Sequence, residues 1–525
     1  MLVSHFALLV VAFVLAVVFT AITREVALFI GLVDAPDRNR KIHARATPLG
    51  GGVAVLLALC ATIAITSFAP SVWGEVVRQQ IGELRGLALA VLVLCVVGVV
   101  DDFQALRARQ KFAGQIVACA IAMSSNLVVE HVQFFGHQID LGLLAWPFTL
   151  FWLLGAINSV NLIDGADGLA ATVGIILTTT IAGMAMLTGH DLEALVALAL
   201  AGALLGFLVF NFPPATIFLG DAGSMCVGLL AGVLAMRCAF KGAASYAMIA
   251  PLAIWAVPAF DCSIAIVRRK LTGRSIAATD RGHLHHCLLR RGFDNRQMLI
   301  WVAVLCLITA TGAIVSLRLD NELYAIGSVL VMVAAMVLTR IFGHAEFLLI
   351  ANTLSRLSVS FIVPAHRQRQ AIRQSAFHLQ GSRDWDSLWA MLIETADAVP
   401  LHTLRLNLNI PWLHESYHAS WSREPKLAPA DCWRVETPLA VGGRIVGTIA
   451  ASGLALDGPV ASRMKQWSQR LNQVEERLAK LLAPSAPTAH ADSSFEYQQP
   501  FQAQDPVSVR RSTEPEPASP SLLGD

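Results

Sequence analysis

The chain contains 525 residues, of which 55% are hydrophobic and 14% are charged, and its mean hydropathy is +0.60. A soluble domain carries roughly 25% charged residues, so this composition excludes a single water-soluble domain. The 39 Lys and Arg residues against 37 Asp and Glu residues leave a net charge of +2, which provides no basic surface for nucleic acid. The nine cysteines stand singly, which predicts small apolar core residues rather than disulfides or metal ligands.

Eleven apolar runs are predicted to cross a membrane, because each approaches the roughly 17 to 25 residues that a helix needs to span a bilayer. In chain order, the runs lie near residues 2–22, 50–69, 84–100, 113–130, 143–160, 169–188, 193–210, 224–238, 246–266, 299–317 and 323–340. Arg24 follows the first run and no basic stretch precedes it, which is the reverse of a cleavable secretory signal. We therefore expect an all-α polytopic membrane protein that keeps its first helix.

The basic residues predict which helix ends face the cytoplasm. With the N-terminus outside, sixteen Lys and Arg residues fall in the cytoplasmic loops, and five fall in the opposite loops, namely Arg78, Arg85, Arg237, Lys241 and Arg318. Cytoplasmic loops are the more basic ones in membrane proteins. The pattern predicts a cytoplasmic C-terminus and short, plain loops on the opposite face.

The chain after the apolar region 1–342 differs in composition. The segment 343–381 mixes apolar residues with arginines, as an interfacial helix does. Residues 382–483 combine an amphipathic pattern with alternating stretches, which predicts a small cytoplasmic α/β domain of unknown role. Residues 484–525 are rich in Pro, Ser and Gln without periodicity, so a disordered tail is expected.

Two acidic residues and a lysine follow the third predicted span. Asp101 and Asp102 end that span, and Lys111 comes later in the segment DDFQALRARQK. Ionisable groups at membrane depth cost free energy and are usually functional or paired. The acidic pair is predicted to face a phosphate or metal site, with Lys111 available for an anion. An ordinary pair of helix-end residues at the membrane interface is the alternative.

Two further loops combine Asp, Asn and Gly residues. The segment NSVNLIDGADGLA, after the fifth span, contains Asn158, Asn161, Asp164 and Asp167, and the segment NFPPATIFLGDAGS, before the eighth span, contains Asp221. Helix capping and tight turns explain single residues of these types. Capping does not explain four such residues in one loop, and the glycines on either side of Asp221 leave the backbone open to an anion.

The loop after the ninth span reads DRGHLHHCLLRRG and carries Arg281, His283, His285 and His286. No cysteine or further histidine stands at the spacing of zinc ligands, so a phosphate-binding cluster is favoured over a zinc site. Asp261 lies just inside the end of the preceding helix. The first cytoplasmic loop adds VDAPDRNRKIH and TPLGGG, whose basic residues are equally typical of an ordinary positive-inside loop.

All five motif-bearing loops fall on the face that is predicted to be cytoplasmic. Carboxylates and amides beside several cations suit a magnesium-bound diphosphate, because oxygens coordinate the metal and cations contact the phosphoryl groups. A soluble acceptor would not require eleven helices, so the second substrate is expected to be a lipid.

At these motifs the chain closely resembles the polyprenyl-phosphate N-acetylhexosamine-1-phosphate transferase family (glycosyltransferase family 4), in particular its bacterial undecaprenyl-phosphate GlcNAc-1-phosphate transferases. The resemblance covers residues 1–342 and rests on the five motifs in the family's order. HLHH is typical of the GlcNAc-1-phosphate branch, whereas the peptidoglycan branch usually has three adjacent histidines. The resemblance implies a multi-pass protein of the bacterial cytoplasmic membrane with its active site on the cytoplasmic face.

The resemblance also implies roles for the acidic and cationic residues. Asp101 and Asp102 match an acidic pair near the lipid phosphate, and Lys111 matches a lysine that contacts the diphosphate. Asn161 and Asp221 match the positions that hold Mg²⁺, with Mn²⁺ as the alternative metal.

Substrate recognition is implied for a second group of residues. Asp167 and Phe218 match positions that recognise uracil by a hydrogen bond and by ring stacking. Asn158 and Asp164 are expected to bind substrate without a more specific role. In the family, one loop closes over the sugar diphosphate. The residues of this chain that match that loop are Arg281, His283, His285 and His286.

The predicted reaction transfers GlcNAc-1-phosphate from UDP-GlcNAc to undecaprenyl phosphate and releases UMP, as the first membrane step of a cell-envelope polysaccharide. Asp101 could act as a base that activates the lipid phosphate. However, a phosphate monoester has a second pKa of about 6 and is mostly dianionic at neutral pH, so it does not require a base. A positioning role for Asp101 is the alternative. The alternatives are a transferase for another UDP-N-acetylhexosamine or for UDP-MurNAc-pentapeptide, a polyisoprenoid or nucleotide-sugar transporter, and a membrane anchor for the C-terminal domain. Association as a homodimer is left open.

Overall fold

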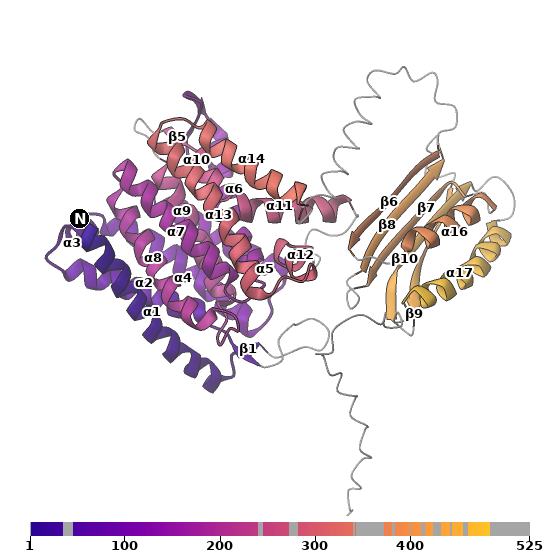
Figure 1. Cartoon of the computed structure of the whole chain (residues 1–525), viewed down its shortest axis with the longest axis horizontal. Helices are drawn as coiled ribbons and strands as arrows, with labels where there is room; N and C mark the ends of the chain where they lie inside the picture. The colour runs from indigo at the N-terminus through magenta and orange to yellow at the C-terminus, as the bar shows by residue number, and fades with distance from the viewer. Residues whose placement is uncertain are drawn as a thin grey trace, which may run out of the picture.

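The computed structural model describes residues 2–34, 46–125, 127–239, 245–271, 282–339, 342, 372–380, 384–398, 401–410, 415–423, 432–441, 444–454 and 460–482. A helical region extends to residue 342, and a region built on a β-sheet begins at residue 372 (Figure 1). Each region has its own buried apolar cluster, which runs from Leu8 to Phe342 in the first and from Trp385 to Leu478 in the second.

The helical region consists mainly of long apolar helices. In chain order they are α1 (Leu2–Ile30), α2 (Gly51–Phe68), α3 (Val72–Gln79), α4 (Ile81–Phe103), α5 (Ala108–Ser124), α6 (Ala145–Ile163), α7 (Leu169–Thr188), α8 (Asp191–Asn211), α9 (Gly220–Cys238), α10 (Ile249–Ile254), α11 (Ala256–Leu271), α12 (Leu284–Arg290), α13 (Asn295–Arg318) and α14 (Leu323–Leu338).

Eight of the described helices are long and apolar enough to cross a membrane, namely α1, α2, α4, α6, α7, α8, α9 and α13. The protein is therefore a mostly helical, multi-pass membrane protein. The runs predicted near 113–130 and 323–340 overlap α5, with 17 residues, and α14, with 16. The eleven predicted runs all overlap helices, but only eight of the described helices have full spanning length.

Two of the predicted spans are shorter for local reasons. Helix α5 ends at Ser124, and the chain then extends toward strand β3 (His131–Phe134). The ninth run is divided at Trp255 into α10 and α11. Pro258 has no N–H to donate to the carbonyl of Ile254, so a continuous helix would lose a hydrogen bond at this point.

The face opposite the motif-bearing loops carries a small sheet. Strands β3 and β4 (His137–Asp140) form an antiparallel hairpin, and β5 (Ser245–Ala247) pairs in parallel with β3. Phe135 and Gly136 both have positive φ in the tight turn between β3 and β4. The prediction of plain loops on this face is therefore wrong. The sheet was missed because β5 comes from a distant segment, and the local sequence does not reveal its pairing with β3.

Helices α8 and α9 form the centre of the helical region. Helix α8 packs against α1 and α7, and α9 packs against α4 and α6. A Cβ atom on Gly228 of α9 would lie 2.7 Å from the carbonyl oxygen of Ala156 in α6, so only glycine permits this contact. Small residues let membrane helices approach closely. Helix α9 thereby packs closely against α6.

The second region is a five-stranded antiparallel sheet with the strand order β6-β8-β7-β10-β9. Its elements are β6 (Ile372–Gln380), α16 (Trp385–Ala398), β7 (Thr403–Ile410), β8 (Glu415–Arg423), β9 (Cys432–Val441), β10 (Arg444–Leu454) and α17 (Val460–Leu482). Helices α16 and α17 contact each other and lie over the sheet (Figure 1).

The sheet changes one predicted boundary. Strand β6 begins at Ile372, in the segment 343–381 that was expected to be an interfacial linker, so the sheet starts before residue 382. Its pairing partner β8 lies far along the chain, which is why the sequence of β6 alone did not place it in the domain. The interfacial helix was predicted over about 344–373; residues 344–371 lie outside the described residues, and Ile372 and Arg373 belong to β6. The tail 484–525 also lies outside the described residues.

Candidate active site

Four helix ends meet at one end of the bundle, which we call the polar end. Helices α4 and α6 finish there, at Phe103 and Ile163, and α5 and α9 begin there, at Ala108 and Gly220. Successive helices run in opposite directions, so the C-terminal ends of α4 and α6 lie beside the N-terminal ends of α5 and α9. The predicted side chains Asp101, Asp102, Lys111, Asn161 and Asp221 come together at this point.

Lys111 bridges two of the carboxylates. Its Nζ lies 3.0 Å from Oδ2 of Asp101 and 2.8 Å from Oδ2 of Asp221. Oδ1 of Asp101 accepts a hydrogen bond of 2.7 Å from the backbone N–H of Leu106. The Asp221 side chain is 32% exposed and the Asp101 side chain only 9%, so Asp221 is the more accessible of the two to a substrate or metal.

Asp102 holds the start of α9. Its Oδ1 accepts from the backbone N–H of Asp221 at 2.8 Å, and its Oδ2 accepts from that of Ala222 at 3.3 Å. A carboxylate at a helix N-terminus also interacts favourably with the helix dipole. Gly220 has a φ of 77°, and a Cβ there would lie 2.6 Å from Oδ2 of Asp102. Both oxygens of Asp102 thus help to orient Asp221, and the predicted place of Asp102 near the lipid phosphate stays a prediction.

Asn161 pairs with Asp221. The Nδ2 group of Asn161 donates to Oδ1 of Asp221 and, at 2.9 Å, to Oγ of Ser224. The Ser224 hydroxyl donates to the carbonyl oxygen of Gly220 at 3.1 Å. No donor in the described part of the chain reaches Oδ1 of Asn161, which leaves that oxygen for a ligand. Ser224 was not predicted, although it stands three residues after Asp221 in the same motif.

Asn158 lies one helical turn before Asn161 and contacts another helix. Its Nδ2 donates to Oε1 of Gln115 at 2.9 Å, and Nε2 of Gln115 donates back to Oδ1 of Asn158 at 3.3 Å. Gln115 is buried. The structure therefore places Asn158, which was predicted to bind substrate, in a bond that braces α6 against α5. Gln115 was not predicted from the sequence, although a polar residue one helical turn after Lys111 in an apolar run could have indicated it.

The two residues predicted to recognise uracil lie in adjoining loops. Oδ2 of Asp167 accepts from the backbone N–H of Ala215 at 3.0 Å, which ties the loop after α6 to the loop before α9. The backbone N–H of Phe218 donates to the carbonyl oxygen of Pro48 at 2.9 Å, and that of Gly51 donates to the carbonyl oxygen of Phe218 at 2.9 Å. Asp167 and Phe218 thus border the same side of the polar end.

The TPLGGG motif packs against the start of α9. Strand β2 (Thr47–Pro48) pairs with β1 (Val33–Asp34), and α2 begins directly after it. A Cβ on Gly52 would lie 2.0 Å from the Cα of Gly223, so the two backbones touch. These glycines serve close packing. The basic part of this loop, residues 35–45, lies outside the described residues.

The histidine segment is anchored to α11. Nδ1 of His283 lies 3.1 Å from Oδ2 of Asp261, and Oδ1 of Asp261 accepts from the backbone N–H of Leu284 at 2.9 Å. The rings of His283 and His285 are nearly parallel with centroids 6.1 Å apart, and those of His285 and His286 are 4.2 Å apart. The predicted Arg281 lies outside the described residues.

His285 connects this segment to the acidic loop. A Cβ on Gly165 would lie 2.8 Å from Nε2 of His285, so the ring touches the backbone next to Asp164. Nε2 is buried, and no described residue forms a hydrogen bond with it. Burial, and then the neighbouring His286 and His283, hold the pKa of His285 well below its usual range. His285 is therefore neutral at physiological pH.

Among the described residues, the carboxylates at the polar end outnumber the cations that face them. Burial, followed by the charges of Asp221 and Asp102, raises the pKa of Asp164 well above its usual value, although Lys111 opposes this effect. One ammonium group therefore does not neutralise the cluster. A divalent cation would compensate the excess charge.

The donor atoms at this end fit a hard divalent cation. Asp221 and Asn161 supply carboxylate and amide oxygens, which Mg²⁺ prefers. Within the described residues, no group of three or more His, Cys, Asp or Glu side chains is arranged to hold a metal without other ligands. Mg²⁺ usually takes only one or two carboxylates and completes its shell with water and substrate phosphates, so the residues present are compatible with such a site.

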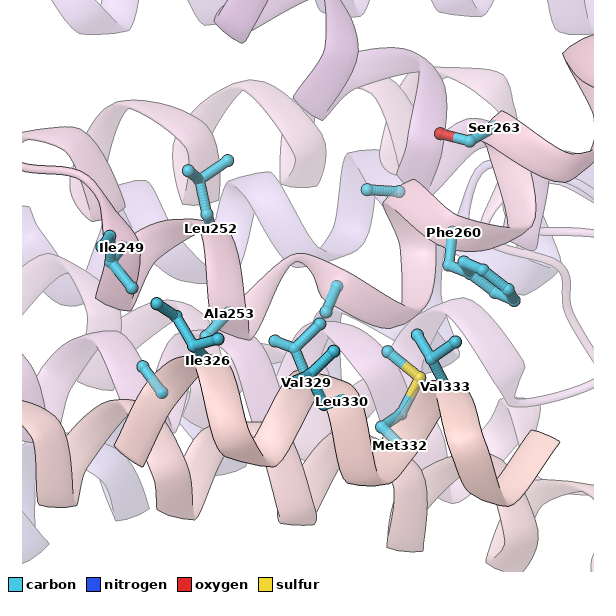
Figure 2. Close-up of a pocket in the computed structure, with 13 residues that line it drawn as sticks. Ile249, Leu252, Ala253, Phe260, Ser263, Ile326, Val329, Leu330, Met332 and Val333 are labelled. Atoms are coloured by element: carbon cyan, nitrogen blue, oxygen red, sulfur yellow. The ribbon is translucent and has the colours of Figure 1, made fainter. Parts of the chain in front are cut away.

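A groove of about 450 Å³ lies between α10–α11 and α14, away from these groups (Figure 2). Phe260, Ile326 and Val333 are among its lining residues, and none of the residues that line it is ionisable. The groove therefore contributes no charged group to the chemistry of the polar end.

Comparison with known proteins identifies the family. The family model described as Glycosyl transferase family 4 matches residues 84–239, which include the acidic pair, Lys111, Asn161 and Asp221. A protein of Bacillus subtilis is 33% identical over 313 residues, which cover 58% of this chain and 84% of that protein. The chain belongs to glycosyl transferase family 4. The resemblance inferred from the motifs is thereby confirmed.

The names of individual relatives indicate the type of reaction. The Bacillus subtilis protein is named "Probable undecaprenyl-phosphate N-acetylglucosaminyl 1-phosphate transferase". A decaprenyl-phosphate N-acetylglucosaminephosphotransferase of Mycolicibacterium smegmatis is 32% identical over 349 residues, or 61% of this chain and 84% of the relative. A phospho-N-acetylmuramoyl-pentapeptide-transferase of Shouchella clausii is 33% identical over 261 residues, which cover 46% of this chain and 75% of that relative.

Proposed function

We propose that the protein transfers GlcNAc-1-phosphate from UDP-GlcNAc to undecaprenyl phosphate and releases UMP. The observation that carries the proposal is the cluster of Lys111, Asp101, Asp221 and Asn161 at the ends of four apolar helices. This arrangement offers a cation, carboxylates and an amide to a diphosphate at the depth where a lipid phosphate lies. The names of the relatives in Bacillus subtilis and Mycolicibacterium smegmatis describe the same class of transfer.

The polar end faces the cytoplasm of a bacterial inner membrane in this proposal. The basic loops lie at the same helix ends as the acidic cluster, which agrees with the positive-inside rule. The shorter helices α5, α11 and α14 complete eleven spans, with the N-terminus outside and the C-terminus inside. UDP-GlcNAc then reaches the site from the cytoplasm, and the product supplies a cell-envelope polysaccharide.

The transfer is a substitution at phosphorus. An oxygen of the lipid phosphate attacks the phosphorus atom next to the sugar, a new P–O bond forms, and the bond to the bridging oxygen of UMP breaks. Lys111 stabilises the negative charge on the equatorial oxygens, and the two carboxylates beside it fix the position of its ammonium group. Asp102 keeps Asp221 in place through the two backbone hydrogen bonds at the start of α9.

Asp221 and Asn161 would hold Mg²⁺, or Mn²⁺ in its place, through the exposed carboxylate and the unused amide oxygen. The metal supplies charge neutralisation for the diphosphate when it is bound. Asp167 and Phe218 bind the uracil ring, and the histidine segment with Arg281 contacts the sugar diphosphate. Asp164 is proposed as a substrate-binding residue near the metal-binding residues, and burial, followed by the charges of Asp221 and Asp102, raises its pKa and favours its neutral form.

A transporter for polyisoprenoids or nucleotide sugars is the second candidate. Such a protein usually carries its polar groups near the middle of the membrane, between paired broken helices. Here the acidic groups lie at helix ends, which favours the transferase. A pure membrane anchor does not account for the bonded cluster at the polar end.

The decisive test of the donor is UMP release by the purified full-length protein in the presence of undecaprenyl phosphate and Mg²⁺. UDP-GlcNAc, other UDP-N-acetylhexosamines and UDP-MurNAc-pentapeptide are supplied in turn. We expect UDP-GlcNAc to have the highest kcat/KM. A preference for UDP-MurNAc-pentapeptide would instead assign the reaction named for the Shouchella clausii relative.

The role of Asp101 is testable through pH. Its carboxylate holds Lys111 and accepts from Leu106, which is the behaviour of a positioning group. Asp101→Asn is therefore expected to lower kcat by a similar factor at each pH from about 6.5 to about 9, because the lipid phosphate is already a dianion over this range. A strong recovery of the variant toward high pH would instead identify Asp101 as a general base.

Removal of the C-terminal region is expected to leave the transferase active. The two regions have separate apolar clusters, and the cluster of the helical region ends with Phe342, whose ring packs edge-on against Phe260 at 5.9 Å. A chain that ends after Gly343 keeps this contact and should retain most of its UMP release per folded molecule. Loss of turnover without loss of folded protein would show that the C-terminal region belongs to the catalytic unit.

A further inference from the structure

Asp261 is a buried carboxylate to which the reaction scheme above assigns no role. It lies in α11 and is 2% exposed, and both of its oxygens are bonded to the histidine segment. Oδ2 lies 3.1 Å from Nδ1 of His283, and Oδ1 accepts from the backbone N–H of Leu284 at 2.9 Å. Burying a carboxylate costs free energy unless it is well bonded, so this arrangement is a specific feature of the site.

These bonds determine the state of the His283 ring. An ionised carboxylate only accepts hydrogen bonds, so the proton of the imidazole must reside on Nδ1. Nε2 then points away from Asp261, and no described residue bonds to it. His283 precedes α12 and is stacked on His285, which in turn touches Gly165 in the acidic loop. The orientation of one ring is thus linked to the position of the segment.

We propose that Asp261 is a positioning residue of the transferase, which fixes the tautomer and orientation of His283 so that Nε2 faces the diphosphate of the nucleotide sugar. The inference rests on the proposed function. Partners that orient a functional imidazole typically change activity by about 10- to 100-fold when they are removed. The competing explanation is that Asp261 merely caps α12 through Leu284.

Asp261→Asn separates the two explanations. The two bonds of Asp261 end on different oxygens, and an amide has an acceptor oxygen at only one of these two positions, so Asn keeps one acceptor in place and loses the other. The backbone N–H can only donate, whereas an imidazole can change tautomer. Asn is therefore expected to keep the bond from Leu284 and to donate from Nδ2 to Nδ1 of His283, which moves the ring proton to Nε2. Asp261→Ala removes both bonds.

The experiment measures kcat and KM for UDP-GlcNAc by UMP release, together with hydrogen exchange of the backbone amides of residues 282–290 in the substrate-free protein. We expect Asp261→Asn to lower kcat/KM by about 10- to 100-fold while amide exchange in α12 stays unchanged. Asp261→Ala should lose at least as much activity and should also exchange faster. The double variant Asp261→Asn/His283→Gln should be no less active than His283→Gln, because both changes act on one imidazole.

Asp294→Asn is the matched control. Asp294 caps α13 in the same manner, since Oδ1 accepts from the backbone N–H of Gln297 at 2.7 Å, but it is not bonded to a histidine. Its replacement should leave kcat/KM unchanged.

Three results would overturn the role of Asp261. Wild-type kcat/KM in Asp261→Asn, with loss and faster exchange only in Asp261→Ala, would show a helix cap and nothing more. Additive losses in the double variant would show that Asp261 acts apart from His283. A wild-type protein that releases no UMP from any UDP-sugar would overturn the proposed function itself, and this role with it.

Discussion

Asp221→Asn is expected to lower kcat by about 100-fold or more, while the protein inserts and folds normally. The carboxylate is bonded through Oδ2 to Lys111 and through Oδ1 to Asn161, and it is the most exposed of the three residues in the salt-bridge cluster. An amide in its place has no charge and one acceptor oxygen. Both the hold on Lys111 and the affinity for a divalent cation are therefore weakened.

The fold should tolerate this change. The start of α9 is held by Asp102 through the backbone N–H groups of residues 221 and 222, and these bonds do not involve the Asp221 side chain. Asp191→Asn is the matched control, because Asp191 is an exposed residue in the first turn of α8 at the other end of the bundle. Near-normal turnover by Asp221→Asn, measured under conditions in which the chemical step limits the rate, would remove Asp221 from the mechanism.

Lys111→Met is the second change with a large expected effect, a loss of about 100-fold or more in kcat. Methionine has similar length but no charge, so the carboxylates of Asp101 and Asp221 would face each other without the ammonium between them. Two uncompensated carboxylates also repel. We therefore expect a lower Tm for this variant in the absence of divalent cation, and a larger gain of Tm on addition of Mg²⁺ than wild type shows.

Two further variants are compared with Lys111→Met: an arginine at the same position, and the same substitution at a distant lysine. Lys111→Arg keeps the charge but replaces the compact ammonium with a planar guanidinium group. Compared with Lys111→Met, it should recover part of the Tm and little of the activity. Lys480→Met changes an exposed lysine of α17 that pairs with Glu476 at 3.0 Å, and it should leave turnover unchanged. If Lys111→Met turns over at the wild-type rate, the cation that contacts the diphosphate must be another residue.

Much of the polar end was predictable from the sequence because its residues are costly in a membrane. Asp101, Lys111, Asn161 and Asp221 stand at the ends of apolar runs, and the alternating direction of the helices brings such ends together. The eighth span was predicted near 224–238, and α9 begins one turn earlier, at Gly220. The family resemblance agreed with this arrangement.

The division of labour among these residues was not predictable. Asp101 and Asp102 are adjacent, yet one faces Lys111 and the other holds the backbone of α9, which depends on the packing of α4 against α9. Asn158 and Asp167 were predicted to bind substrate, and the structure adds that they also bond to Gln115 and to the backbone of Ala215. Sequence patterns identify polar residues in apolar surroundings, whereas the partner of each residue is set by tertiary contacts.

The β-structure shows the same limit. Strand β6 and strand β5 each pair with a segment far away in the chain, and neither strand carries a pattern strong enough to be assigned alone. The helices were easier, because a long apolar run is decisive by itself. Three of the eleven predicted runs, those at α5, α10–α11 and α14, correspond to described helices that are shorter than a full span.

The most direct test of the central claim follows the phosphorus atom next to the sugar. UDP-GlcNAc labelled with ³²P in its β-phosphate is incubated with the purified protein, undecaprenyl phosphate and Mg²⁺, and the lipid and aqueous products are separated. The account predicts that the label enters the lipid fraction and that an equal amount of unlabelled UMP appears in the aqueous fraction. Labelled UDP in the aqueous fraction, with an unlabelled glycolipid, would show transfer of the sugar alone and would contradict it.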